Sequence, residues 1–104
     1  MEYDFLNYEK ATLTVMVQAN NPTRIKELMD KAIPAGAEAF GIQFEQMLPE
    51  YRTPEVYRDL FGYAKGRPSY VTNYRGTQNN GKSDEELSDE LVELAECGAD
   101  LCDI

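Results

Sequence analysis

Short apolar segments recur along this chain at nearly even intervals. Each combines a few apolar or β-branched residues with turn-forming residues on either side, a pattern typical of buried strands. The segments span residues 12–18, 39–44, 69–74 and 99–104. Their starts lie roughly 27 to 31 residues apart, which is the spacing that successive βα units produce.

Three stretches with helical periodicity separate these segments. Pro22 and Pro54 stand where the first turn of a helix tolerates proline, and Ser83 precedes Glu86 by three residues, the spacing of a capping box. The apolar faces that follow are Ile25, Leu28, Met29, Ala32 and Ile33, then Val56, Leu60, Phe61 and Ala64, then Leu87, Leu91, Leu94 and Ala95. The predicted order is therefore βαβαβαβ, with right-handed crossovers and a parallel sheet.

The spacing favours one kind of α/β fold, the (β/α)₈ TIM barrel. A barrel of about 250 residues has a period of about 31 residues, so this chain of 104 residues measures half a barrel. We expect a single partial domain, residues 1–104, with the first four strands and three helices, and an N-terminal extension over residues 1–11. The triplets GAE at 36–38 and GAD at 98–100 support a repeated unit. Because the sequence stops at Ile104 within a predicted strand, we expect an N-terminal fragment.

Charge and composition narrow the possible functions. Ten Lys and Arg against nineteen Asp and Glu give a formal net charge of -9, which disfavours non-specific binding to nucleic acid or to an anionic membrane. The chain has no histidine, so by itself it lacks a Ser-His-Asp relay, a histidine metal site and a histidine base. Neither a signal peptide nor a membrane span is present in the pattern. We expect a cytoplasmic location, no metal and no cofactor.

Polar residues that follow the predicted strands are the candidates for a site, because parallel sheets place their chemistry at the carboxyl ends of the strands. Arg75 is the only cation among them. The set comprises Gln18, Asn20, Gln43, Glu45, Thr72, Asn73, Arg75 and Asp103.

The loop at residues 76–83 allows a different interpretation. Its sequence GTQNNGKS matches G-x-x-x-x-G-K-[ST], in which backbone N–H groups and the Lys hold phosphates. Lys82 would bind the phosphates of a nucleotide and Ser83 would bind its Mg²⁺, with Asp103 as the carboxylate beside the metal. Three acids at 84–86 would compete with a polyphosphate for the positive end of the helix dipole, so Ser83 also fits a plain N-cap. A non-catalytic acidic interaction domain, using the helix from Ser83 to Glu96, is the third alternative.

Four segments in the same order resemble the first half of type I 3-dehydroquinate dehydratase, a (β/α)₈ enzyme of the shikimate pathway. They are TVMVQANN at the first strand, then GAEAFGIQFEQML, which is similar to the family's GAD-hydrophobic-E-x-R-x-D-x-L, then RPSYVTNYRGTQNNG, similar to P-x-x-x-T-x-R with a Glu-Gly-Gly loop, and finally GADLCDI, similar to GAD-x-x-D-x-E. The resemblance covers about residues 13–104. It implies a lyase of aromatic amino acid biosynthesis.

The family's reaction, as this resemblance implies it, runs through a Schiff base between a lysine and the substrate ketone, with a histidine moving the proton. Both residues come from the second half of the barrel, so this chain alone is expected to be inactive. For the substrate, a small carboxylate-bearing polyhydroxylated compound, Arg75 matches a family contact. Gly41 and Gln43 stand where the family has a glutamate and an arginine, and Asn79 replaces a loop glutamate. The full-length protein is expected to be a homodimer.

Overall fold

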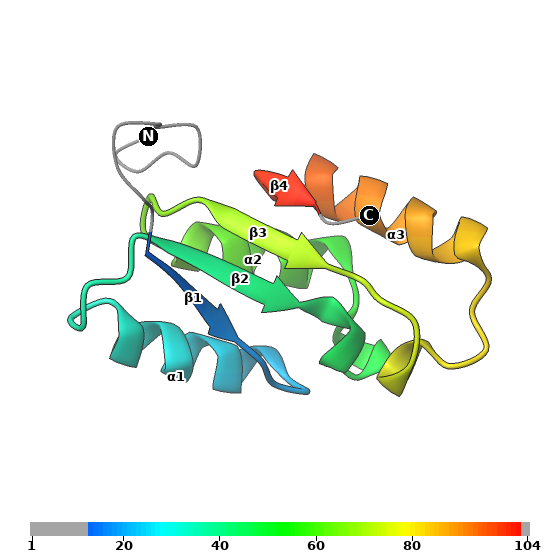
Figure 1. Ribbon diagram of the computed structural model, residues 1–104, viewed down its shortest axis with the longest axis horizontal. Helices are drawn as coiled ribbons and strands as arrows, with labels where there is room; N and C mark the ends of the chain where they lie inside the picture. Colours follow the sequence, from blue (N-terminus) through cyan, green and yellow to red (C-terminus); the bar gives the residue numbers. More distant parts are fainter. Residues whose placement is uncertain (1–12, 103–104) are drawn as a thin grey trace.

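The computed structural model describes residues 13–102, and it confirms the predicted α/β class, a four-stranded parallel sheet with three helices (Figure 1). The strands are β1 (Thr14–Val17), β2 (Ala39–Gln43), β3 (Ser69–Thr72) and β4 (Leu101–Cys102), and the helices are α1 (Pro22–Ala32), α2 (Pro54–Tyr63) and α3 (Asp84–Glu96). Short 3₁₀ turns cover Phe44–Gln46, Pro49–Tyr51 and Thr77–Asn79. The predicted extension at 1–11, Asp103 and Ile104 lie outside the described residues.

Each α-helix begins at a side chain that satisfies a backbone N–H of the first turn. Asn21 accepts from the N–H of Arg24 at 2.8 Å, and Thr53 accepts from the N–H of Val56 at 3.3 Å. At α3 the capping box predicted from the sequence forms, with Ser83 Oγ accepting from the N–H of Glu86 at 3.1 Å. Since these caps are local, the short-range pattern is enough to place the helix starts.

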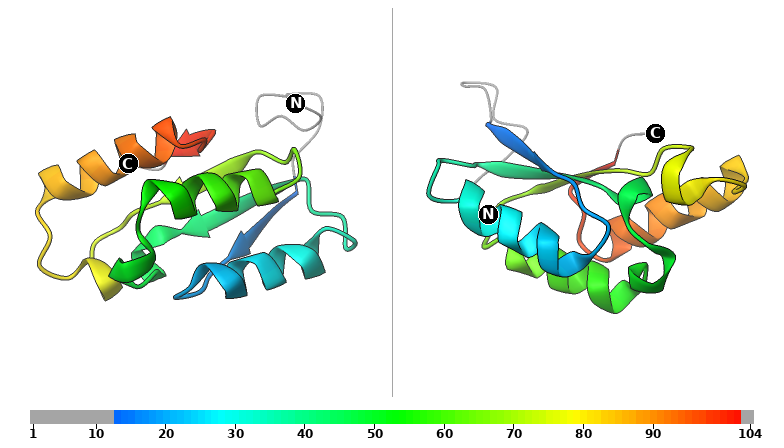
Figure 2. Two further views of the ribbon diagram at one scale, coloured as in Figure 1. Left: turned by 180° about the vertical axis from the view of Figure 1, so that it is seen from behind. Right: turned by 90° about the horizontal axis from the view of Figure 1, so that it is seen from below.

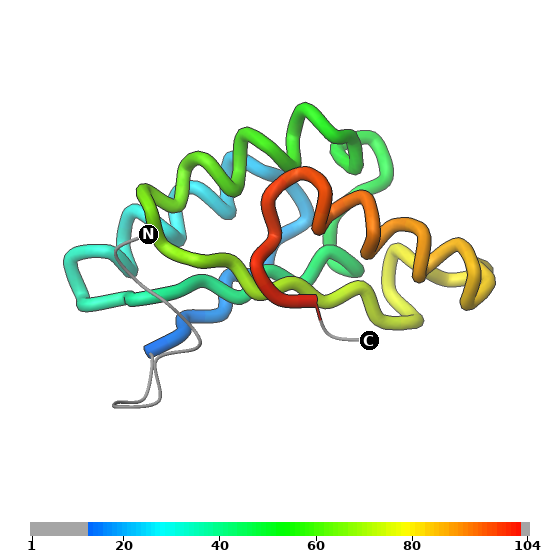
Figure 3. The backbone as a smooth tube through the Cα atoms, turned by 90° about the horizontal axis from the view of Figure 1, so that it is seen from above, coloured from blue at the N-terminus to red at the C-terminus, as the bar shows by residue number. Residues whose placement is uncertain are grey.

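The four strands lie in chain order, β1-β2-β3-β4, and all pairs are parallel. The three helices cover the same face of the sheet, as the views from behind and from below show (Figure 2). The tube view places β4 at one end of the sheet, directly after α3 (Figure 3). A strand order that never reverses, with every helix on one side, is a singly wound sheet, whereas a doubly wound sheet reverses its order at a switch point.

The helix-covered face of the sheet forms the hydrophobic core. Phe40, Ile42 and Val71 project from the central strands and are fully buried against the apolar faces of the helices. Phe44 continues this layer past the end of β2 and meets the ring of Tyr57 edge-on, with centroids 5.2 Å apart. None of the helices within residues 13–102 is long and apolar enough to cross a membrane.

The opposite face of the sheet carries no described helix. One row of paired residues crosses it from β1 to β4, and we call it the open row: Met16, Gly41, Tyr70 and Leu101. Met16 and Leu101 are 42% and 40% exposed. A Cβ at position 41 would overlap Met16 Sδ and lie 2.7 Å from Met16 Cε, so the Met16 side chain occupies the space that a larger residue at 41 would need.

Candidate functional site

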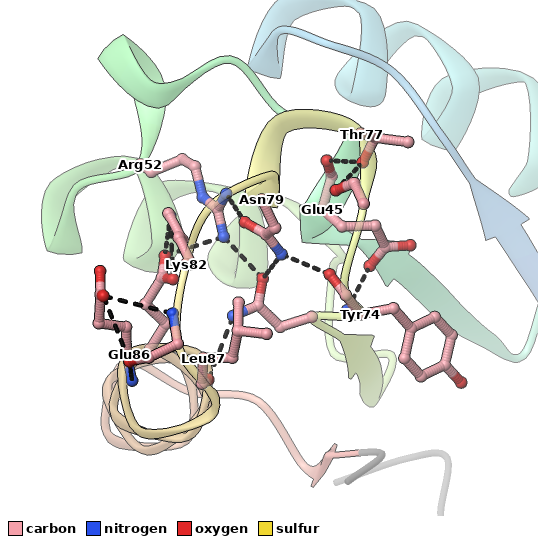
Figure 4. A network of polar contacts seen from close by, with 12 residues as sticks. Glu45, Arg52, Tyr74, Thr77, Asn79, Lys82, Glu86 and Leu87 are labelled. Carbon is pink, nitrogen blue, oxygen red and sulfur yellow. Dashed lines mark hydrogen bonds and ion pairs between the residues drawn. The ribbon is translucent and has the colours of Figure 1, made fainter.

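The carboxyl edge of the sheet gathers the βα loops, because all four strands run in the same direction. Two polar groups form there and are joined through the loop that follows β3 (Figure 4). One centres on a buried arginine from the loop before α2. The other centres on a buried glutamate just beyond the end of β2.

The first group, which we call the Arg52 cluster, comprises Arg52, Asn73, Asn79, Lys82 and Glu90. The side chain of Arg52 is only 4% exposed. Its guanidinium donates to the side-chain oxygens of Asn79 and Asn73, the latter at 2.6 Å, and pairs with Glu90 at 2.9 Å. Lys82 Nζ reaches both oxygens of Glu90 at 2.9 Å. Two cations thus share one carboxylate, and the cluster ties the loop before α2, the end of β3 and α3 together.

Asn79 lies inside this cluster and is buried. Its amide nitrogen donates to Asn73 Oδ1 at 2.8 Å and to the carbonyl of Tyr74 at 2.6 Å, while its oxygen accepts from Arg52. An amide has two N–H donors, so both donors of Asn79 are used within the protein. Asn79, which the resemblance implies to be a substrate contact, thus holds its own loop in place through these bonds.

The second polar group surrounds Glu45. This carboxylate is buried, and its Oε1 accepts from the hydroxyl of Thr72 at 2.7 Å and from the N–H of Tyr74 at 3.2 Å. Thr77 donates from its hydroxyl to the backbone carbonyl of Glu45. The Glu45 group therefore joins the end of β2 to the end of β3 and to the loop beyond it.

Gly41 and Gln43, two further predicted site residues, lie on the open face of β2. Gln43 is half-buried at the end of the strand and is paired in register with Thr72 of β3. Gly41 lies one step below, in the open row. Gln43 therefore places a neutral amide where the resemblance implies an arginine. The thioether of Met16 fills the space beside Gly41, where the resemblance implies a glutamate.

Arg75 is placed differently from the other predicted contacts. Its side chain is 74% exposed, and its guanidinium pairs with the carboxylate of Asp84, the first residue of α3. Both side chains line a cavity of about 310 Å³ between the end of β3 and α3, together with Asn73, Tyr74, Leu87, Ser88 and Leu91. Gln43 is not among these lining residues. The structure therefore brings Gly41 and Gln43 onto one face and directs Arg75 toward α3.

In the loop at residues 76–83, the N–H groups nearest α3 and the Lys82 ammonium bond within the protein. The N–H groups of Asn79 and Lys82 bond to loop carbonyls at 2.8 and 3.1 Å, and the N–H of Ser83 bonds to Glu86 at 3.3 Å. Lys82 bonds to Glu90. A phosphate would have to displace these partners and also meet the acids of the first turn of α3. The geometry matches the N-cap interpretation of Ser83.

Two titratable groups near the site have shifted pKa values. Burial raises the pKa of the Tyr57 hydroxyl above its ordinary value near 10.0, and the adjacent Arg52 offsets part of that rise. Burial also raises the pKa of the Cys102 thiol. Cys97 and Cys102 are both free, and no group of three or more metal-ligating side chains occurs within the described part of the chain.

Arg52 is absent from the residues selected on the sequence, although it bonds to three side chains of the site, Asn73, Asn79 and Glu90. It follows no strand directly, so a search for residues just past strand ends does not find it. A broader rule would have found it, since every loop between a strand and the next helix lies at the carboxyl edge in a parallel sheet. Arg52 sits in the loop between β2 and α2.

Neither a scan against protein-family models nor a search of curated proteins gives a match for this chain. The likeness to the dehydratase family therefore rests on the four sequence segments and on their place in the sheet.

Proposed function

We propose that this chain is the first half of a (β/α)₈ barrel of the type I 3-dehydroquinate dehydratase kind. The observation that carries the proposal is the singly wound sheet, with strands in chain order and all helices on one face. A doubly wound nucleotide-binding fold would place helices on both faces and reverse its strand order. A closing barrel requires the arrangement seen here.

A groove along α3 supports the same proposal. It measures about 260 Å³ and is lined by Ser88, Leu91, Val92, Ala95 and Cys102. Val92, an apolar residue outside the buried face of α3, is 57% exposed. In a barrel the next βα unit packs on this side of α3 and β4, so the groove lies where that helix would bury these side chains.

In this proposal the chain contributes substrate-holding groups to a carboxylate-bearing, polyhydroxylated compound. Arg75, once it exchanges its exposed partner Asp84 for the ligand, supplies a charge for the carboxylate, and Gln43 at the end of β2 supplies an amide for hydroxyl groups. None of the lysines within residues 13–102 lies on a strand, so the Schiff-base lysine and the histidine would come from the second half of the barrel. The chain alone then binds without turning the substrate over, and no metal or cofactor takes part.

The proposal is tested by titrating the ¹⁵N-labelled chain with quinate, which carries a carboxylate and several hydroxyl groups, and following the amide signals by NMR. We expect saturable shifts at Gln43, Thr72 and Arg75. Inositol, a polyol without the carboxylate, serves as the matched ligand and should give no saturable shifts. Gln43→Arg should tighten quinate binding because a guanidinium replaces a neutral amide. Absence of quinate binding, or equal binding of inositol, would contradict the proposed substrate class.

A further inference from the structure

The buried carboxylate of Glu45 uses only one of its two oxygens within the described residues. Its Oε1 accepts from the Thr72 hydroxyl at 2.7 Å and from the Tyr74 N–H at 3.2 Å, whereas Oε2 has no hydrogen-bond partner among residues 13–102. The only fully enclosed side-chain atom without a partner in that range is Arg52 Nε, so Oε2 still reaches solvent. A carboxylate has acceptor sites on both oxygens, so Glu45 can accept further hydrogen bonds at the carboxyl edge.

No cation neutralises this buried charge within the described part of the chain. Glu45 is 4% exposed, and none of the ion pairs there includes it. Burying a carboxylate without a cation is costly unless hydrogen bonds reach its oxygens. A neutral glutamine could hold Thr72 and Tyr74 through its carbonyl oxygen. Fastening the loop therefore does not require a carboxylate, whereas binding a hydroxyl donor at Oε2 makes use of one.

The backbone contact that fixes Glu45 comes from a residue in a rarely adopted conformation. Thr77 has a φ of 48°, in the left-handed region that β-branched residues seldom occupy, and its hydroxyl donates to the backbone carbonyl of Glu45 (Figure 4). Such conformations persist where surrounding contacts determine them, and they cluster at ligand sites and active sites. The contacts to Thr72, Tyr74 and Thr77 thus hold both the backbone and the carboxylate of Glu45 in place before a ligand arrives.

Glu45 lies beside a residue that the proposed function already uses. Gln43 is the register partner of Thr72, and neighbouring strands lie about 4.8 Å apart. The Gln43 side chain also has no hydrogen-bond partner among the described residues. An amide N–H donates to a hydroxyl oxygen, and a carboxylate accepts from a hydroxyl hydrogen. The two side chains that adjoin Thr72 therefore offer complementary groups to a compound with several hydroxyl groups.

We propose that Glu45 is a specificity-determining ligand contact, in which Oε2 accepts a hydrogen bond from a hydroxyl group and makes the site prefer hydroxylated carboxylates over plain ones. The inference rests on the proposed function and deepens it by naming the residue that selects the hydroxyl groups. The negative charge of Glu45 repels a ligand carboxylate. The hydroxylated part of the ligand then faces Glu45, and its carboxylate faces Arg75.

The affinities for quinate and for cyclohexanecarboxylate, measured by NMR titration, test this proposal. Cyclohexanecarboxylate has the ring and the carboxylate of quinate without its hydroxyl groups. The wild type should prefer quinate at least about ten-fold, because a hydrogen bond to a charged acceptor contributes that much. Glu45→Gln keeps a carbonyl oxygen for Thr72 and Tyr74 but removes the charged acceptor, so the preference should fall about five- to ten-fold.

Glu50→Gln is the matched control, because it makes the same change at an exposed carboxylate in the same loop, and it should leave the preference unchanged. A second readout needs no variant and covers the case in which Glu45→Gln unfolds. In the wild-type chain, quinate should shift the ¹³C signal of the Glu45 carboxyl group saturably, and cyclohexanecarboxylate should not.

The outcomes separate this inference from the proposed function. A preference for quinate that Glu45→Gln leaves unchanged, an equal loss in Glu50→Gln, or a Glu45 carboxyl signal that does not respond to quinate would overturn the inference and leave quinate binding in place. Equal binding of inositol and quinate that Glu45→Gln abolishes would support the hydroxyl contact and contradict the proposed substrate class. A wild type that binds none of the three compounds would overturn both.

Discussion

Two arginines at the carboxyl edge of the sheet differ in almost every physical respect. Arg52 is 4% exposed and joins three partners, Asn73, Asn79 and Glu90, whereas Arg75 is 74% exposed and pairs with Asp84. A buried guanidinium must keep its partners, because losing one leaves an uncompensated polar group out of contact with water. An exposed one exchanges its partner for water at little cost. The comparison assigns Arg52 to holding the edge together and leaves Arg75 available to a ligand.

The largest effect should come from Arg52→Ala. Removing this side chain leaves Glu90 with Lys82 alone and strips Asn73 and Asn79 of a charged donor. We expect the free energy of unfolding to fall by about 3–5 kcal/mol, the usual cost of breaking a buried ion pair from one side. Urea denaturation followed by circular dichroism measures this loss. Arg52→Lys keeps the charge without the planar fork and should lose less, and equal loss in both variants would count against the role of the fork.

Asn79 and its neighbour Asn80 offer a matched pair within one loop. Asn79 is buried with its amide bonded on both sides, while Asn80 is exposed. Asn79→Ala should lower the free energy of unfolding by about 1–3 kcal/mol, since Arg52 and Asn73 lose a partner in a buried site. Asn80→Ala should change it by less than about 0.5 kcal/mol. Equal effects in the two variants would mean that the amide network does not hold the loop.

Arg75→Ala tests the other half of the comparison. Its ion pair is exposed and screened, so the free energy of unfolding should change by no more than about 1 kcal/mol. The quinate dissociation constant should rise about ten- to a hundred-fold, because a charge-assisted hydrogen bond contributes roughly 1.5 to 3 kcal/mol. The NMR titration measures this rise, and Arg58→Ala on α2 is the control for loss of one exposed positive charge. An unchanged quinate affinity would remove Arg75 from the site.

High pH should lower the free energy of unfolding through Tyr57, whose hydroxyl is adjacent to Arg52. Burial raises the pKa of Tyr57 in the folded chain above about 10.0, its value when unfolded, so the folded state holds the proton more tightly. This contribution is complete below pH 10 and is lost as pH rises through the folded pKa. Unfolding free energies measured from pH 9 to 11.5 should therefore decline more steeply for the wild type than for Tyr57→Phe. If the unfolding free energy declines equally with pH in the two proteins, the pKa of Tyr57 is not raised in the folded state.

The smallest expected effect concerns the loop at residues 76–83, which follows Arg75. Because the N–H groups of Asn79, Lys82 and Ser83 and the ammonium of Lys82 are bonded within the protein, millimolar Mg-ATP should leave the melting temperature unchanged. A ligand at 100 times its dissociation constant would stabilise the chain by about 2.7 kcal/mol, which a thermal melt detects. A saturable increase abolished by Lys82→Ala would restore the nucleotide interpretation.

Local sequence patterns predicted the elements of this fold well. The helix starts at Pro22, Pro54 and Asp84 agree with the pattern because a cap involves residues only three or four apart. The strands are shorter than predicted, since β1 starts at Thr14 and β3 ends at Thr72. A strand extends only as far as its ladder partners, and those come from distant segments.

The sequence by itself determined the order of elements, the α/β class and the acidic character of the chain, because periodicity, capping and charge are local or additive properties. Tertiary structure decided the roles of the polar residues. Arg52 and Asn79 lie 27 positions apart and meet only once β2, β3 and α3 are assembled. The strand-end pattern selects Arg75 and the family resemblance adds Asn79, but neither shows that Arg75 is exposed with Asp84 as its partner while Asn79 is buried. Burial depends on what packs above a residue, which the residue's own neighbours in sequence do not specify.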